Sequence, residues 1–255
     1  MSGFSVVIPA RFGSTRLPGK PLIELAGKTM IERVAERALR SGASKVIIAT
    51  DDKRVVDAVK HLPVQAMLTS QKHVSGSDRV QEIASHKEWD SGDVVVNVQG
   101  DEPLIPPAVI DQVADLLEED DSFAASTLSE PLHSLEEVLD PNIVKVVCDL
   151  SGRALYFSRA AIPWDRDQFP EQGSFDSQPA WRRHIGIYAY RVGALNDFVV
   201  MPKSQLERIE SLEQLRFIEN GYSIVVADAC EHIPAGVDTE TDVMRVRQVL
   251  RDCPQ

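Results

Sequence analysis

The sequence predicts an α/β fold, in which helices cover both faces of a mainly parallel sheet and an antiparallel region is inserted. Two observations support this expectation. In the first half of the chain, short apolar segments alternate with helical patterns, an order that is typical of parallel sheets. After about residue 120 the strand-like segments follow one another without that alternation, which predicts an antiparallel insertion over about residues 130–200.

Four strands and a capped helix are expected in the first half. The helix begins at Thr29, because Thr29 and Glu32 match a capping box, and apolar residues then recur at helical spacing until Gly42 ends the helix. The expected strands, each a short apolar run, are residues 4–8, 45–50, 64–68 and 93–98.

The second half is expected to contain shorter strands, a long loop and two helices. The polar stretch 163–179 holds three prolines and predicts a long loop, a kind of segment that is often functional. Strands are expected at residues 143–149, 154–157, 185–191 and 222–227, and helices at about 204–220, which Gly221 ends, and from about 239. Since no linker-like stretch interrupts the chain, residues 1–255 are expected to form a single domain.

The composition excludes several classes of partner. The 255 residues carry a net charge of −12, which disfavours a nucleic-acid polymer or an anionic membrane, because both need a basic face. The three scattered cysteines argue against a zinc site and against a disulfide framework. The N-terminus lacks the features of a signal peptide, and no stretch approaches the roughly 20 apolar residues of a membrane helix. We therefore expect a cytoplasmic protein that binds no nucleic acid and no membrane.

The most informative segment is the loop that follows the first expected strand, residues 9–21. It combines glycines and hydroxyls with three cations, Arg11, Arg16 and Lys20. Glycines let backbone N–H groups approach phosphate oxygens, arginine can bind these oxygens in pairs, and lysine adds a point charge. The loop matches neither the Walker motif nor the dinucleotide fingerprint. It predicts a phosphate-binding loop of another type, and the alternative is a solvated basic turn.

Two acidic motifs are candidate magnesium sites. Asp101 follows the expected strand 93–98 in the motif Gln-Gly-Asp-Glu-Pro. A carboxylate at a strand end beside a phosphate loop suits Mg²⁺, which takes few protein oxygens together with phosphate oxygens. Asp238 precedes the last expected helix. The alternatives are a plain turn for Asp101 and capping of that helix by Asp238 or Thr239.

For three other features of the sequence, a functional role and a purely structural role both remain open. Residues 75–79, Ser-Gly-Ser-Asp-Arg, open a helix and either contact a base or cap that helix. Glu213 and Arg216 fall on the apolar face of the expected helix 204–220, where charges are tolerated when they are paired or functional. They therefore form either a structural pair with each other or part of a site. His184 is either a site residue or a satisfied buried histidine.

Six segments of the sequence resemble one known family. They are IPARFGSTRLPGKPL (8–22), NVQGDEP (97–103), YFSRAAIPWDRD (156–167), RHIGIYAYR (183–191), LEQLR (212–216) and GVDT (236–239). Together they closely resemble the 3-deoxy-manno-octulosonate cytidylyltransferases, also called CMP-Kdo synthetases. The segments span almost the whole chain in the family's order, whereas the first alone would indicate only the broader class of sugar nucleotidyltransferases. The resemblance implies a Rossmann-like nucleotidyltransferase sheet.

The resemblance also implies the site residues. The residues implied to bind the CTP phosphates are Arg11, Ser14, Arg16 and Lys20, and those near the cytidine are Gly76, Ser77 and Asp78. Asp101 and Asp238 are implied to bind Mg²⁺ and, with Arg11, Arg16 and Lys20, to be catalytic. The residues implied to line the sugar-acid pocket are Gln99, Arg159, Arg166, His184, Tyr188, Glu213 and Gln214. The family further implies a homodimer built partly from the inserted region.

The implied reaction transfers CMP from CTP to Kdo, 3-deoxy-D-manno-octulosonate, and releases pyrophosphate, as the sugar-activation step of lipopolysaccharide biosynthesis. The nearest alternative is a cytidylyltransferase for a related acid such as 8-amino-3,8-dideoxy-manno-octulosonate. A metal-dependent glycosyltransferase is a second alternative, but the basic loop argues against it, because that class takes sugars from finished sugar nucleotides. The third alternative is a non-catalytic regulator that binds CTP.

Overall fold

The computed structural model describes residues 3–14, 16–73, 75–87, 89–166 and 181–252. Within these ranges nine strands form one sheet, in the order β11-β7-β10-β6-β1-β4-β5, with the β8–β9 hairpin beside β10. The strands are β1 (Ser5–Ala10), β4 (Lys45–Thr50), β5 (Gln65–Leu68), β6 (Val94–Asn97), β7 (Ala125–Pro131), β8 (Lys145–Cys148), β9 (Ala154–Ser158), β10 (Arg182–Arg191) and β11 (Ile224–Asp228). A separate small sheet pairs β2 (Glu24–Leu25) with β3 (Lys28–Thr29).

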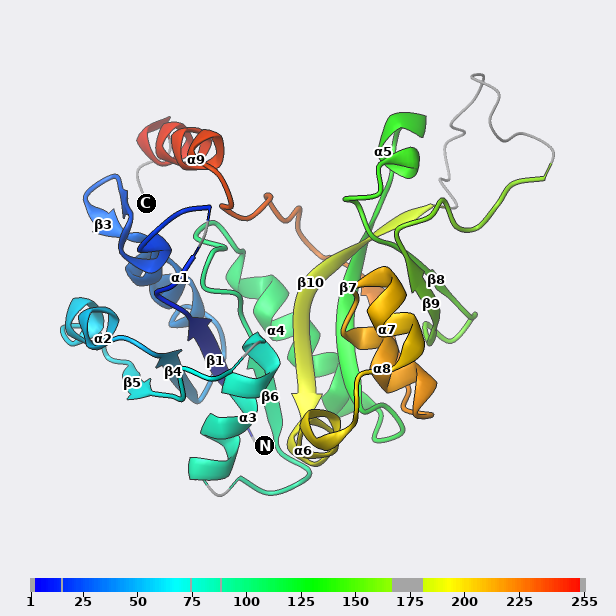
Figure 1. The fold of residues 1–255 in the computed structure, drawn as a ribbon, viewed down its shortest axis with the longest axis horizontal. Helices are drawn as coiled ribbons and strands as arrows, with labels where there is room; N and C mark the ends of the chain where they lie inside the picture. The colour runs from blue at the N-terminus through cyan, green and yellow to red at the C-terminus, as the bar shows by residue number, and fades with distance from the viewer. Residues whose placement is uncertain (1–2, 15, 74, 88, 167–180, 253–255) are drawn as a thin grey trace.

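Strand direction divides the large sheet into two parts. Strands β5, β4, β1 and β6 are parallel to one another. β10 is antiparallel to β6 on one side and to β7 on the other, and β11 is parallel to β7. Figure 1 shows β10 as the long strand between the two parts, with β8, β9 and α5 (Leu135–Leu139) on the far side from β1. The predicted α/β fold with an antiparallel insertion is confirmed.

Helices cover both faces of the sheet and bury a core on each. Side chains alternate along β1, so that Val6 and Ile8 enter one core and Val7 the other, as the two-residue period of a strand requires. The first core is covered by α1 (Met30–Ala38), α2 (Lys53–Val59) and α4 (Pro107–Glu119). The second is covered by α3 (Gly76–Lys87), α6 (Val192–Val200), α7 (Gln205–Glu210) and α8 (Gln214–Glu219).

A third apolar cluster attaches the C-terminal helix to the loop after β1. Leu17 and Leu25 pack there with Val237 and with residues of α9 (Glu240–Asp252). The cluster therefore holds two segments together that are more than two hundred residues apart in the sequence. It places Asp238, next to Val237, beside the loop that carries the predicted phosphate-binding residues.

Several predicted element boundaries are corrected by the structure. The capping box of Thr29 is confirmed, but α1 ends at Ala38, before Gly42. The single helix expected over 204–220 is two helices, α7 and α8, separated by Ser211 in the left-handed conformation with φ 54°. β10 starts at Arg182, so that His184 lies inside a strand and not in front of it. β7 and α6 were not predicted.

Most of the expected loop 163–179 lies outside the described residues. In the part of the chain that the structure describes, none of the helices has the length and apolar character needed to cross a membrane.

Candidate active site

A pocket lies at the carboxyl ends of β1 and β6. It has a volume of about 550 Å³. Its lining comes from the loop after β1, the turn after β6, the start of α3 and the segment before α9. In open α/β sheets this edge is where ligands bind. Of the predicted site residues, those that line this pocket are Arg11, Ser14, Arg16, Lys20, Gly76, Gln99, Asp101 and Asp238.

The basic loop is shaped by its own small residues and by one apolar anchor. Ser14 Oγ accepts a hydrogen bond of 3.2 Å from the N–H of Leu17, and Leu17 is buried in the third apolar cluster. Gly19 adopts φ 69° in front of the short 3₁₀ helix η1 (Lys20–Leu22), a conformation that favours glycine. The loop therefore leaves Arg11 and Arg16 exposed and turns Lys20 inward.

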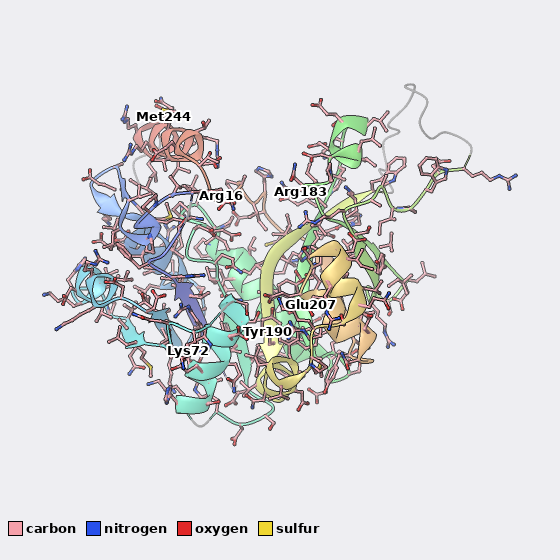
Figure 2. All side chains as sticks on the ribbon, viewed as in Figure 1. Arg16, Lys72, Arg183, Tyr190, Glu207 and Met244 are labelled. Carbon is pink, nitrogen blue, oxygen red and sulfur yellow. The ribbon has the colours of Figure 1, made fainter. Side chains whose placement is uncertain are left out.

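Lys20 lies between the two predicted metal ligands. Its Nζ is 2.5 Å from Asp101 Oδ2 and 2.9 Å from Asp238 Oδ1. Burial alone would lower the pKa of Lys20, but the attraction and hydrogen bonds of the two carboxylates outweigh it and raise the pKa. Arg16 Nη2 is 3.3 Å from Asp238 Oδ2, and Figure 2 shows Arg16 near the segment that leads to α9. The cluster is a compact array of two anions and two cations on one wall of the pocket.

Close backbone contacts bring the two carboxylates together. A Cβ atom on Gly100 would lie 2.7 Å from Pro9 O, and one on Gly236 would lie 3.3 Å from Asp101 O. The N–H of Val237 donates to Asp101 O at 2.9 Å. The glycines thus allow the turn after β6 to touch both the end of β1 and the segment before α9.

The arrangement fits a magnesium ion held together with a triphosphate. Among the described residues, no group of three or more His, Cys, Asp or Glu side chains is placed so that it could hold a metal ion by itself. Mg²⁺ is nevertheless bound in nucleotide sites by one or two carboxylates together with phosphate oxygens and waters. Asp101 and Asp238 supply two carboxylates that are 35% and 51% exposed and that face the same pocket.

The helix-capping alternative for Asp238 is excluded by the geometry of α9. Thr239 Oγ1 accepts from the N–H of Asp242 at 3.3 Å, and Asp242 Oδ2 accepts from the N–H of Thr239 at 2.9 Å. These two bonds satisfy the helix start, and Asp242 has a pKa lowered to about 2, chiefly by the hydrogen bond from Thr239. The side chain of Asp238 is therefore left to contact Lys20 and Arg16.

Sequence reasoning missed a buried ion pair behind the basic loop. Asp51, at the end of β4, accepts from the N–H of Phe12 at 2.9 Å and from Arg79 Nη2 at 2.8 Å. Arg79 is 2% exposed and also donates to Thr69 Oγ1 at 2.5 Å. The pair joins the start of α3 to the residue after Arg11. The sequence did contain one indication that Asp51 lies near the site: it follows the strand β4, much as Asp101 follows β6.

His73 is a second residue that the sequence did not reveal. It lines the 550 Å³ pocket, and its Nε2 makes a short contact with Glu82 Oε2. Glu82 in turn accepts from the N–H of Ser70 at 2.9 Å. Glu82 therefore ties the segment before α3 to the helix itself and orients His73.

A second pocket, of about 220 Å³, adjoins the first. Gln99 lines both pockets, and Ser77 in the second follows Gly76 in the first. The predicted sugar-acid residues in its lining are Gln99, His184, Tyr188, Glu213 and Gln214. Five of the seven residues expected at the sugar thus meet at one place.

Several buried polar side chains line the second pocket, together with apolar ones. Burial lowers the pKa of His184 to about 3, so the imidazole is neutral, and its Nε2 lies 3.1 Å from Thr127 Oγ1. Burial also raises the pKa of Glu213, which accepts from Ser77 Oγ at 3.2 Å. Two buried polar atoms of the lining, Asn97 Oδ1 and Tyr188 Oη, lack a hydrogen-bond partner among the described residues. Such atoms suit a ligand rich in hydroxyl groups.

Of the two interpretations of Glu213 and Arg216, the structural pair between them does not form. Arg216 instead donates to Glu207 through Nε at 2.7 Å and through Nη2 at 2.5 Å, and Figure 2 places Glu207 on the helix pair beside β10. The turn at Ser211 breaks the helix, so that residues on either side of the break face each other. Glu213 therefore does not neutralise Arg216, and the other interpretation, that Glu213 belongs to a site, stays a prediction.

Four predicted residues lie outside the pocket for which they were expected. Arg159 Nε donates to Glu210 O at 2.8 Å and Nη1 to Pro141 O at 2.9 Å, so its guanidinium holds the hairpin. Arg166 is exposed, and neither arginine lines either pocket. Asp78 accepts from the N–H of Ser75 at 3.1 Å and so caps α3. Ser77 lines the second pocket and not the first.

The comparisons with known proteins agree with one another. Residues 5–225 match the family model described as cytidylyltransferase. The chain is 55% identical over 251 residues to the 3-deoxy-manno-octulosonate cytidylyltransferase of Saccharophagus degradans, covering 97% of this chain and 98% of that one. It is 56% identical over 250 residues to the enzyme of the same name from Cellvibrio japonicus, with 97% and 98% covered.

A solved structure matches the whole fold. It is that of CMP:2-keto-3-deoxy-manno-octonic acid synthetase complexed with CTP, with a TM-score of 0.88 and 38% identity over 98% of this chain and 99% of the other. The similarity of fold therefore extends over both parts of the sheet.

Proposed function

Because the chain belongs to the 3-deoxy-manno-octulosonate cytidylyltransferase family, we propose that it transfers CMP from CTP to Kdo and releases pyrophosphate. The observation that carries this proposal is the pair of adjoining pockets. One is lined by four cations, Arg79 among them, and two carboxylates, and the other by hydroxyl, amide, imidazole and carboxyl groups, with Gln99 common to both. A triphosphate and a polyhydroxylated acid fit these two chemistries.

The reaction requires the two substrates to meet where the pockets join. The anomeric oxygen of Kdo forms a bond to the α-phosphorus of CTP, the bond from that phosphorus to the bridging oxygen of the β-phosphate breaks, and the hydroxyl proton passes to water. Arg11, Arg16 and Lys20 surround the space for the triphosphate. In this assignment they hold the phosphates and stabilise the leaving pyrophosphate.

We assign the metal to Asp101 and Asp238. Lys20 contacts both carboxylates, and it is near enough to neutralise either one before the nucleotide binds. When bound there together with phosphate oxygens, Mg²⁺ supplies positive charge that offsets the charge of the triphosphate.

The second pocket is assigned to the sugar acid. Neutral His184 can both donate and accept a hydrogen bond, and Glu213 and Gln214 add groups on the facing helix α8 and its start. We keep Arg159 and Arg166 as proposed sugar-acid contacts on the family resemblance alone. A homodimer built partly from the inserted region and a cytoplasmic location belong to the same proposal.

A pyrophosphate-release assay over the four ribonucleoside triphosphates, with and without Kdo and Mg²⁺, tests the function. We expect release only with CTP, Kdo and Mg²⁺ together, because a site built for a small pyrimidine penalises a purine. Binding of CTP without release would favour the regulator instead. Faster turnover of the 8-amino acid than of Kdo would favour the related cytidylyltransferase.

A further inference from the structure

A third pocket lies outside the candidate active site, between the C-terminal part of α1 and the segment that precedes α4. It has a volume of about 280 Å³. Three of its lining residues are cations: Arg33 and Arg37, four residues apart on one side of α1, and Arg40, two residues beyond the end of that helix. The carboxylate of Glu36 lines the pocket as well. Leu39 and Pro103 complete its apolar part. A concave group of three cations is unusual on a chain whose net charge is −12.

The positive charge of this pocket is only partly neutralised. Arg33 is held by backbone groups, with Nε 3.1 Å from Leu25 O and Nη2 2.6 Å from Ala26 O. Among the described residues, neither Arg37 nor Arg40 makes an ion pair within 4.0 Å. The neighbouring carboxylate of Glu36 is paired with Lys28.

The surroundings of Arg37, one of the three arginines of this pocket, shift its pKa. It is partly buried, and burial followed by repulsion from Arg40 and Arg33 lowers its pKa, against a weaker attraction from Glu231 and Glu36. Placing like charges together beside apolar surface costs folding free energy. An anion bound between the guanidinium groups would remove that cost.

We propose that this pocket binds a small phosphate-bearing anion through Arg37 and Arg40, with Arg33 as a fixed third cation. The planar guanidinium group presents paired N–H donors that match phosphate oxygens. The apolar wall of Leu39 and Pro103 excludes water from one side and strengthens these contacts. Pro103 follows Asp101 by two positions, so an anion bound here touches the segment that carries a predicted metal ligand. Orthophosphate and pyrophosphate, the product of the proposed reaction, are the two sources to distinguish.

Isothermal titration with each anion separately tests the proposal, in the absence of CTP and Kdo. The background is Arg16→Ala/Lys20→Ala, which removes two cations of the active-site pocket. We expect one remaining site for orthophosphate or pyrophosphate, weakened about tenfold or more by adding Arg37→Gln/Arg40→Gln. The control with the same charge change, Arg208→Gln/Arg251→Gln, alters two exposed arginines on other helices and should leave that affinity within about twofold.

The unliganded protein gives an independent readout. Relief of the like-charge repulsion predicts that Arg37→Gln holds or raises the melting temperature without anion and loses the rise that phosphate causes. Absence of any binding in the active-site background, or equal weakening by the control, would overturn the proposal. Because no substrate is present, neither result depends on the proposed reaction.

Discussion

Glu207, in α7, and Glu213, the residue before α8, should respond in opposite ways to replacement by leucine. Glu207 accepts two hydrogen bonds from Arg216, and the two side chains are 4% and 8% exposed. Removing one partner of a buried pair leaves the other charge unpaired, which costs about 3–5 kcal/mol. For a domain of this size, Glu207→Leu should lower the melting temperature by roughly 6–20 °C.

Glu213→Leu should not destabilise the protein. In the described part of the chain Glu213 has one hydrogen bond, from Ser77 Oγ at 3.2 Å, and its raised pKa shows that burial disfavours its charge. Leucine removes this cost and leaves the pair of Arg216 intact. We expect the melting temperature to hold or rise, while the KM for Kdo rises or kcat falls and the KM for CTP stays near the wild-type value.

Two measurements on both variants test these expectations: thermal melting and steady-state kinetics. Glu240→Leu, at an exposed position, is the control. A large loss of melting temperature in Glu213→Leu with unchanged kinetics for Kdo would refute the assignment of Glu213 to the sugar. Equal melting of Glu207→Leu and the control would refute the magnitude given to the buried pair.

Three further predictions rest on other parts of the site. Lys20→Ala should lower kcat about 10²-fold or more, since one preorganised contact to the leaving phosphates is lost. A change under threefold would mean that the loop is a basic surface turn that does not bind the phosphates. Asp51→Asn should raise the KM for CTP more than the KM for Kdo, because the N–H of Phe12 loses its charged acceptor; equal effects on both constants would mean general destabilisation. His184 has a pKa near 3 when folded and an ordinary value of 6.5, so the unfolded chain takes up the proton first and stability falls as pH drops from about 6.5 towards 3. His184→Gln should remove that part of the fall, as measured by denaturant unfolding at pH 7 and pH 5, and an unchanged slope would contradict it.

The sequence predicted those parts of the molecule that depend on local order. The capping box of Thr29 and Glu32 needs only residues three apart, and it forms as expected. A loop after a strand of a parallel sheet must reach the carboxyl edge, and this rule alone brought Arg11 and Asp101 to one pocket.

Local sequence patterns did not predict which side chains of distant segments would contact each other. The pairing of Arg216 with Glu207 depends on the left-handed turn at Ser211. The sequence does not predict this turn, because the position holds a serine and not a glycine, and no proline stands nearby. Asp51 and Arg79 meet because β4 and α3 pack together; the sequence places Asp51 after an expected strand and Arg79 at an expected helix start, but neither pattern shows that the two side chains pair. Whether Asp238 or Thr239 caps the last helix is settled only by the bonds of Thr239 and Asp242, and the metal-binding role of Asp238 stays a prediction.

The direction of β10 explains how the second pocket comes to lie beside the first. A parallel strand next to β6 would bring a loop to the carboxyl edge, whereas antiparallel β10 brings its own first half there. Tyr188 pairs with Asn97, the last residue of β6, and the pairing with β7 shifts register between Ile185 and Tyr188. His184 therefore extends beyond the end of β6, towards Gln99. Side chains fixed in a central strand keep their positions better than those of a loop, so the antiparallel strand β10 gives the second pocket, which we propose for the sugar acid, a wall whose side chains are held in place.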